Sequence, residues 1–303
     1  MVSSPWVGSR AIWRRLWRLE PERPVRHPLV LIHGMSSSPL AWDPVLPLLS
    51  GWREVHVLAL PGHRGGRPLA HPGELAMMDY VDEIEREMNL LGLDKADLVG
   101  NSLGGWVALQ LAGRGRANSV VCLAPAGGWP VGGPFDKFVT TQFALGHRAC
   151  KRLVSPRGKR FMRSARVRRA VLKAMVAKPE MISDRQFDDI VHDVADCQAL
   201  RYAVGRPAAR DVSSVPRADC PVLIAWSQHD RVLISRAARR RLESQVGDPE
   251  VTVLRGVGHV PMSDDPALVA EVILRFTAAA DDVSMAESQT NGHATDMSSP
   301  SPP

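Results

Sequence analysis

The sequence lacks the features that mark several special classes of protein. No apolar run among its 303 residues approaches the roughly 20 residues needed to cross a bilayer, which argues against a membrane-spanning helix. Its four cysteines are widely spaced and form no C-x-x-C pair, so neither a disulfide scaffold nor a cysteine-based metal site is expected. The N-terminal residues contain no apolar segment typical of a secretory signal. We therefore expect a soluble, cytoplasmic, globular protein.

Acidic residues are missing from one long stretch. Thirteen lysines and arginines occur from Lys137 to Lys178 without an aspartate or glutamate, and we call this stretch the basic block. Because the formal net charge is only +6, the rest of the chain is net acidic. The basic block has few aromatic residues and no recognition motif, so nucleic-acid binding is not expected. The alternatives are a solvated helical surface, or a surface that attracts an anionic substrate or membrane.

Apolar runs that end in glycine or proline alternate with helical patterns in the first part of the chain. The runs are residues 28–34, 54–62, 97–100 and 119–125, and the helical patterns are 38–49, 74–91 and 103–113. Runs this apolar predict strands that are buried on both faces. The alternation is typical of a parallel sheet with helices on both faces, and so of the α/β fold class.

Strand-like runs are absent from residues 126 to 215. Helical patterns occupy 135–145, 158–177 and 183–204, and Ser183 and Gln186 form a capping box at the start of the last one. Strand patterns return at 222–226 and 250–254, and a final helix begins at Pro266.

The chain is therefore expected to contain one α/β core with a helical insertion. The predicted parts are an N-terminal edge segment (1–27), a core (28–125 and 216–280), a helical cap insertion (126–215) and a disordered tail (281–303). Residues 11–19 of the edge segment alternate well enough for an edge strand, although their tryptophans also suit a short amphipathic helix.

Chemically useful side chains follow the predicted strands. His33 follows the first strand, Ser102 the third, Asp230 the penultimate one and His259 the last. In an open α/β sheet, ligands bind beyond the carboxyl ends of the strands, so these residues are expected to meet at one edge. Ser102 also lies in a G-x-S-x-G pattern, in which small neighbours allow a sharp turn between strand and helix.

These motifs, taken together, resemble the α/β-hydrolase fold superfamily. The matching segments are 31–34 (LIHG), 60–63 (LPGH), 100–105 (GNSLGG), 220–230 (CPVLI to Asp230) and 258–261 (GHVP), and the resemblance spans residues 28–279. The chain order of serine, aspartate and histidine is the order of that family. The resemblance implies hydrolase chemistry, with the helical insertion forming a cap over the active site.

The resemblance assigns a role to each site residue. Ser102 is the predicted nucleophile, His259 the base that takes its proton, and Asp230 the acid that orients His259. Backbone N–H groups of Met35 and Leu103 are the predicted oxyanion hole. His33 is interpreted as a structural histidine of the oxyanion loop. Other aspartates near Asp230 in the sequence, namely Asp211, Asp219 and Asp264, are alternatives for the acid, but Asp230 directly follows an apolar strand.

The predicted reaction is hydrolysis of a carboxylic ester through an acyl-enzyme intermediate. The alternatives are a carbon–carbon bond hydrolase of vinylogous diketones and, from a different class, a catalytically silent ligand-binding protein. Relatives with aspartate at the elbow are dehalogenases or epoxide hydrolases, and Ser102 argues against both. Neither a cofactor nor a metal is predicted. The expected partner is a small molecule, anionic or bearing an acyl chain, with weak membrane-surface association as a further prediction; the sequence leaves the oligomeric state open.

Overall fold

The computed structural model describes residues 26–69, 75–203 and 206–296. Six parallel strands form one sheet in the order β2-β1-β3-β4-β5-β6. Their bounds are β1 Leu29–Ile32, β2 Val55–Leu58, β3 Ala96–Asn101, β4 Ala117–Leu123, β5 Val222–Ser227 and β6 Glu250–Leu254. This arrangement confirms the predicted fold class. The suggested edge strand at 11–19 lies outside the described residues.

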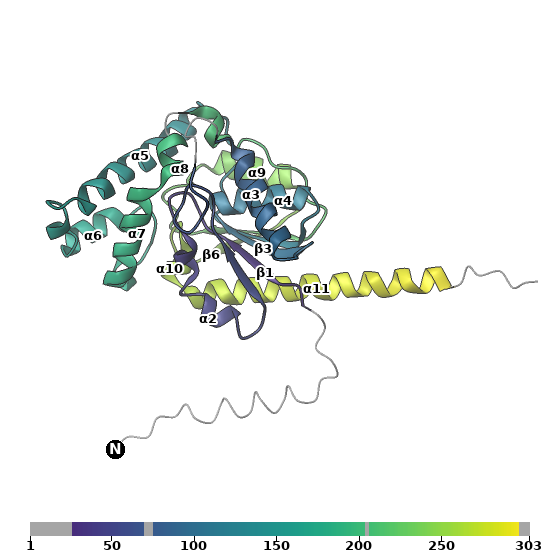
Figure 1. Cartoon of the computed structure of the whole chain (residues 1–303). Coiled ribbons are helices and arrows are strands. Elements are labelled where there is room, and N and C mark those ends of the chain that lie inside the picture. The colour runs from purple at the N-terminus through teal and green to yellow at the C-terminus, as the bar shows by residue number, and fades with distance from the viewer. Residues whose placement is uncertain (1–25, 70–74, 204–205, 297–303) are drawn as a thin grey trace, which may run out of the picture.

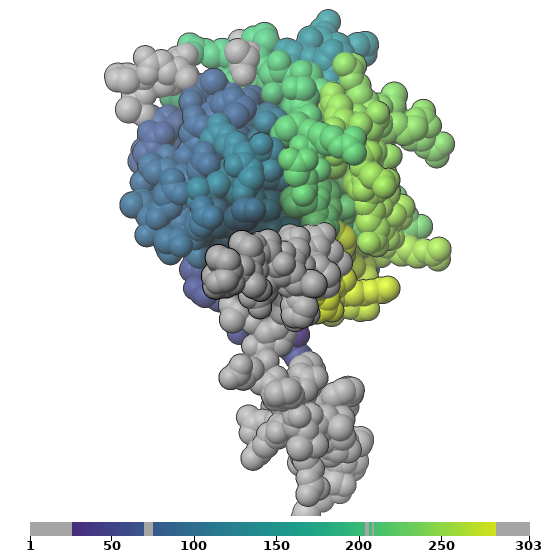
Figure 2. All heavy atoms as spheres, turned by 90° about the vertical axis from the view of Figure 1, so that its right-hand side faces the viewer, coloured from purple at the N-terminus to yellow at the C-terminus, as the bar shows by residue number. Residues whose placement is uncertain are grey.

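Helices cover both faces of the sheet (Figure 1). One face carries α3 Met77–Leu90, α4 Leu103–Gly113 and α9 Arg236–Val246. The other carries the 3₁₀ helix η2 Pro39–Trp42 together with α2 Leu46–Leu49, α10 Pro261–Asp264 and α11 Pro266–Asp296. Figure 2 shows the first face, where early chain segments in blue lie beside late segments in light green.

The side chains of β1 explain why both faces must be covered. Val30 and Ile32 belong to the apolar cluster beneath α3 and α4, whereas Leu29 and Leu31 belong to the cluster on the α11 side. Because successive strand residues point to opposite faces, an uninterrupted apolar run needs a helical layer on each side.

The segment between β4 and β5 is helical, and we call it the helical insertion. Its elements are α5 Pro134–Val154, η3 Lys159–Phe161, α6 Ala165–Leu172, η4 Pro179–Met181, α7 Asp184–Asp196, α8 Gln198–Ala203 and η5 Pro207–Arg210. Helices α5, α6 and α7 project to one side of the sheet (Figure 1). They share an apolar cluster of their own, which includes Leu172, Phe187 and Val191.

Several element boundaries differ from the sequence expectation. The helix expected at 135–145 continues to Val154, and the one expected at 158–177 is divided into η3 and α6. The helix expected at 38–49 is divided into η2 and α2, because Pro44 lies between them and lacks the N–H that a continuous helix needs. The helix expected at 183–204 begins at the predicted capping box but is interrupted at Cys197, which has an extended ψ of 107°. The next two backbone N–H groups donate to the Gly62 carbonyl in the loop after β2.

A further difference concerns the C-terminal part. Residues from 281 were expected to be disordered, but α11 continues to Asp296. Asp281 forms a 2.7 Å ion pair with the buried Arg53, which ties this part of the helix to the core. Among the helices of the described segments, none has both the length and the apolar character needed to span a bilayer.

Candidate active site

The turn at Ser102 is held in a strained conformation. Ser102 connects β3 to α4 with φ of 53° and ψ of −115°, in a region that non-glycine residues seldom adopt. A Cβ atom at Gly100 would lie 2.2 Å from the Gly104 carbonyl oxygen, and one at Gly104 would lie 2.2 Å from the Ile32 carbonyl oxygen. Only glycine fits at either position. The G-x-S-x-G pattern is therefore a packing requirement of this turn.

Backbone strain gathers at one edge of the sheet. Ser36, Ser102 and Ala124 are the non-glycine residues with positive φ in the described ranges, and they follow β1, β3 and β4, respectively. Parallel strands place these three positions at the same carboxyl edge. Strained residues persist only where the surrounding structure holds them in place, and they cluster at functional sites.

Asp230 and His259 form a buried pair. The Nδ1 of His259 lies 3.0 Å from Asp230 Oδ2, and the side chains are at most 1% exposed. The second carboxylate oxygen accepts hydrogen bonds from the backbone N–H groups of Val232 and Leu233, at 2.8 and 2.9 Å. Burial alone would raise the pKa of Asp230, but the nearby His259 and these hydrogen bonds hold it below its ordinary value. The carboxylate is thus ionised and positioned to orient the imidazole.

The residue before Ser102 connects the elbow to the histidine. Asn101 donates through Nδ2 to the His259 carbonyl at 3.0 Å and to the Leu123 carbonyl at 2.9 Å. The His259 Nε2 is buried and has no hydrogen-bond partner within the described part of the chain. With Nδ1 donating to Asp230, Nε2 is the nitrogen that can accept a proton.

Asp264 binds the backbone of the same loop. Its carboxylate accepts from the N–H of Gly258 at 2.7 Å and from the N–H groups of Ala177 and Lys178, at 2.8 to 3.0 Å. Asp264 was a sequence candidate for the acid, but its oxygens serve backbone amides, whereas Asp230 contacts His259. The contact also fixes the helical insertion against the His259 loop.

Two buried histidines shape the loop that contains Met35. His33 Nε2 accepts from the Leu60 N–H at 3.1 Å, and His63 Nε2 accepts from the Ser36 N–H at 3.0 Å. Burial lowers the pKa of His33 to about 3 and that of His63 to about 4, so both rings are neutral acceptors at physiological pH. This geometry agrees with the interpretation of His33 as structural, and it indicates the same structural role for His63.

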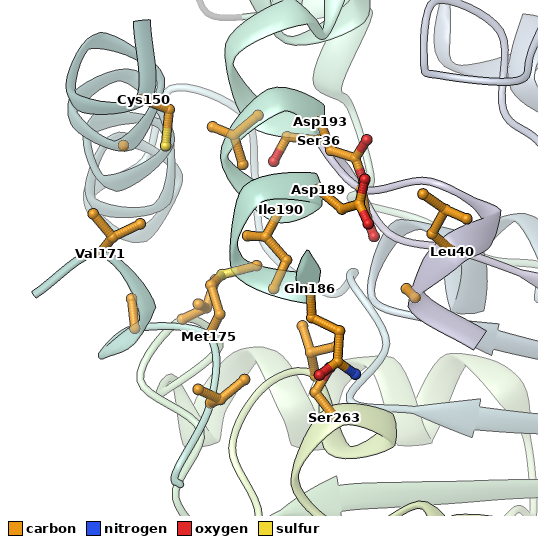
Figure 3. Close-up of a pocket in the computed structure, with 18 of the residues that line it drawn as sticks. Ser36, Leu40, Cys150, Val171, Met175, Gln186, Asp189, Ile190, Asp193 and Ser263 are labelled. Atoms are coloured by element: carbon orange, nitrogen blue, oxygen red, sulfur yellow. The ribbon is translucent and has the colours of Figure 1, made fainter. Parts of the chain in front are cut away.

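Two cavities adjoin these residues. A small pocket of about 80 Å³ is lined by Ser102, Met35 and Leu103, so the predicted nucleophile and both predicted oxyanion residues share it. A large cavity of about 640 Å³ lies between the helical insertion and the core (Figure 3). Phe143 and Val232 line both.

Sequence reasoning missed three residues near the site. Asn101 lies inside the elbow motif, but nothing in the pattern indicates that its amide reaches the His259 loop. Asp136 is buried, pairs with Arg210 at 3.1 Å, and lines the small pocket with it. These two residues are far apart in sequence and belong to no motif, so no sequence signal could have joined them.

The lysines and arginines of the basic block lie outside both cavities, although apolar side chains of the same stretch, such as Phe143, line them. None of its thirteen lysines and arginines is among the residues that line the small pocket or the large cavity. Most are exposed on α5, η3 and α6. Across the described residues, no group of three histidine, cysteine, aspartate or glutamate side chains is arranged to hold a metal ion.

Comparison with known proteins identifies the family. A sequence model described as the alpha/beta hydrolase family matches residues 29–272. The chain belongs to the alpha/beta hydrolase family. It is 35% identical over 201 residues to the epoxide hydrolase EphH of Mycobacterium tuberculosis, with 65% of this chain and 92% of the relative covered. These findings support a hydrolase that acts on small molecules.

Solved structures of further family members share the fold. An esterase from Thermogutta terrifontis superposes with a TM-score of 0.62 at 20% identity, covering 84% of this chain and 90% of the esterase. A meta-cleavage product hydrolase from Pseudomonas fluorescens superposes with a TM-score of 0.63 at 20% identity, covering 84% and 91%. At these identities the likeness concerns the fold alone.

Proposed function

We propose that this α/β hydrolase cleaves carboxylic esters of a small or lipid-like substrate through an acyl-enzyme intermediate. The observation that carries the proposal is the buried Asp230–His259 pair, which leaves His259 Nε2 without a partner in the described chain. Asn101, the residue before the strained Ser102, donates a hydrogen bond to the His259 backbone carbonyl and so links the pair to the turn. A nucleophile, a base and an orienting acid are the parts that acyl transfer requires. The helical insertion acts as the cap in this proposal.

The reaction follows from the roles of these groups. His259 Nε2 takes the Ser102 hydroxyl proton as Oγ attacks the carbonyl carbon, and the oxyanion accepts hydrogen bonds from the N–H groups of Met35 and Leu103. The intermediate collapses, the C–O bond breaks, and the departing alcohol takes the proton from His259. Water then attacks the acyl-Ser102 ester by the same route and releases the acid.

Epoxide hydrolysis is the second candidate, because the relative from Mycobacterium tuberculosis carries that name. A carboxylate that opens an epoxide forms an ester, which water can cleave. Attack by Ser102 would instead form an ether, which the same machinery cannot hydrolyse. Epoxide opening here would therefore need water as the direct nucleophile, with His259 as its base. Equal turnover of an epoxide by wild-type protein and Ser102→Ala would favour this candidate.

Carbon–carbon bond hydrolysis and membrane association have weaker support. A hydrolase acting on an anionic dienoate would need cations near the substrate, and no lysine or arginine of the basic block lines either cavity. Arg185 and Arg210 do line them, but they pair with Asp189 and Asp136, respectively. Association of the exposed basic block with an anionic membrane stays a prediction, which co-sedimentation with phosphatidylglycerol vesicles tests directly.

The test of the ester proposal is the Ser102→Ala variant assayed with p-nitrophenyl butyrate. We expect kcat to fall by about 10⁴-fold or more, because loss of a triad nucleophile leaves only binding and oxyanion stabilisation. Ser164→Ala is the matched control, since Ser164 begins α6 without a side-chain capping bond. An unchanged circular dichroism spectrum excludes misfolding. Undiminished ester turnover in Ser102→Ala would reject the proposal.

A further inference from the structure

The two cavities beside the site differ greatly in size. The small pocket at Ser102 has about 80 Å³, roughly half of a 150 Å³ protein cavity that accommodates benzene. The large cavity has about 640 Å³, which is within the roughly 300–1,000 Å³ range of small-molecule sites. A substrate that fills both must therefore have one short group and one long or bulky group.

The large cavity suits an uncharged, apolar group. Aliphatic, aromatic and sulfur-containing side chains from α5, α6, α7 and the core form most of its wall, including Phe143, Leu145, Cys150, Val171, Met175 and Ile190. Figure 3 shows Val171, Met175 and Ile190 around the open centre.

Two of the three carboxylates that line this cavity, Asp189 and Asp193, pair with groups of the protein itself. Arg64 pairs with Asp189 at 2.9 Å and with Asp193 at 2.7 Å, and Ser38 donates to Asp193 at 2.6 Å. A charged substrate group would have to displace these partners, whereas an alkyl chain gains from leaving water without breaking them.

The large cavity begins next to the reacting groups. Ser36 lines it and follows Met35 of the predicted oxyanion hole, and Val260 lines it and follows His259. Phe143, from the middle of α5, lines both cavities and stands at their common boundary.

We propose that the large cavity binds the long, uncharged alkyl or acyl chain of the substrate, while the small pocket holds the short group and Phe143 limits its size. The assignment of a bond to be cleaved rests on the proposed ester hydrolysis. The binding of an apolar chain in the large cavity does not depend on that proposal.

Gly146 offers a direct way to block the large cavity. It lies in α5, lines the cavity, and a Cβ atom built on it meets no neighbouring atom within 4 Å. Gly146→Phe fills space there, and Gly146→Ala adds only a methyl group. Both replacements favour a helix over glycine, so neither is expected to prevent folding.

Chain-length preference is the first measurement. Wild-type protein is expected to have a higher kcat/KM for p-nitrophenyl decanoate than for p-nitrophenyl acetate. Gly146→Phe should lower kcat/KM for the decanoate by about tenfold or more, the equivalent of about two methylene groups left in water, and lower it far less for the acetate. Gly146→Ala, which adds only a methyl group, should have a much smaller effect on the decanoate than Gly146→Phe. An equal loss for both esters, or no loss for either, would overturn the assignment.

The boundary residue is tested separately. Phe143→Ala should join the two cavities and raise kcat/KM for esters that are bulky on both sides, relative to the acetate. Phe138→Ala is the control, because Phe138 lies on the same helix, is 39% exposed and lines neither cavity. The same change in both variants would contradict a boundary role for Phe143.

Binding without turnover separates this inference from the proposed function. The neutral fluorescent probe N-phenyl-1-naphthylamine is titrated into Ser102→Ala protein and displaced with 1-decanol. We expect binding in Ser102→Ala and an affinity about tenfold weaker once Gly146→Phe is added, because the probe loses apolar contact area. Equal affinity in the two proteins overturns the inference. If Ser102→Ala keeps its esterase activity but the probe result holds, the proposed function fails and the cavity assignment stands.

Discussion

The carboxyl and amino edges of the central sheet are built in opposite ways. At the carboxyl edge, Ser36, Ser102 and Ala124 have strained backbones, and His259 Nε2 is buried without a partner in the described chain. At the amino edge, charged side chains are buried but paired. The comparison shows that one edge has strained backbone and an unpartnered ring nitrogen, whereas the opposite edge has buried ion pairs.

Arg53 is the centre of the amino edge. It precedes β2 and is only 5% exposed. Its guanidinium contacts Asp97 of β3 at 3.0 Å, Asp281 of α11 at 2.7 Å and the Thr277 hydroxyl at 2.9 Å. Asp97 also accepts a hydrogen bond from Ser119 of β4 at 2.7 Å. One network therefore connects β3, β4 and the segment before β2 to the last helix.

The largest predicted effect tests the carboxyl edge. Asp230→Asn should lower kcat for p-nitrophenyl butyrate by about 10⁴-fold, because the amide favours the wrong imidazole tautomer. Thermal stability should change little in comparison. Asp211→Asn serves as the control, since Asp211 is exposed and its carboxylate accepts a hydrogen bond from the nearby Ser213 N–H. Comparable losses in the two variants would show that Asp230 does not act through His259.

The next effect tests the amino edge. Arg53→Met leaves the Asp97 carboxylate buried without its cation, and the free energy of unfolding should fall by about 3–5 kcal/mol. The kcat/KM of the remaining folded protein should stay near the wild-type value. Urea unfolding measures the stability, and ester assays at low temperature measure kcat/KM. Arg86→Met, which removes a surface cation next to Glu83, should have a much smaller effect. A loss of kcat without a loss of stability would contradict a purely structural role for the amino edge.

The smallest effect concerns pH. The folded-state pKa of His63 is about 4, below its ordinary value of 6.5, so the unfolded chain binds more protons between these values. Stability from the neutral ring is complete above pH 6.5 and is lost as the pH falls toward 4. Between neutral pH and about pH 5, wild-type protein should lose about 2 kcal/mol more than His63→Asn. Equal pH dependence in the two proteins would show that His63 is not buried as a neutral acceptor.

The carboxyl edge was the more predictable of the two. Glycines at 100 and 104 are required by contacts within a few residues of Ser102, so the turn leaves a local sequence pattern. The strand periodicity then predicts which residues follow each strand. The amino edge leaves no such pattern, because Arg53, Asp97 and Asp281 meet only after the whole sheet has formed.

The helical insertion was predictable only in outline. Its helical content and the capping box at Ser183 follow from local preferences, and both appear in the structure. The break at Cys197 could not be predicted, because it depends on the Gly62 carbonyl from the loop after β2. The cavity depends on how α5, α6 and α7 pack, which no single segment encodes. That Phe143 lines both cavities therefore emerged only from the three-dimensional arrangement.

The central claim is that Ser102 is an activated nucleophile, and covalent labelling tests it most directly. Wild-type protein is treated with a fluorophosphonate, digested and examined by mass spectrometry, with Ser102→Ala and His259→Ala treated in parallel. We predict one phosphonyl adduct on Ser102, none in Ser102→Ala, and a labelling rate at least about 100-fold lower in His259→Ala, since the base no longer takes the proton. Absence of an adduct, or an adduct on a different serine at the wild-type rate, would contradict the account.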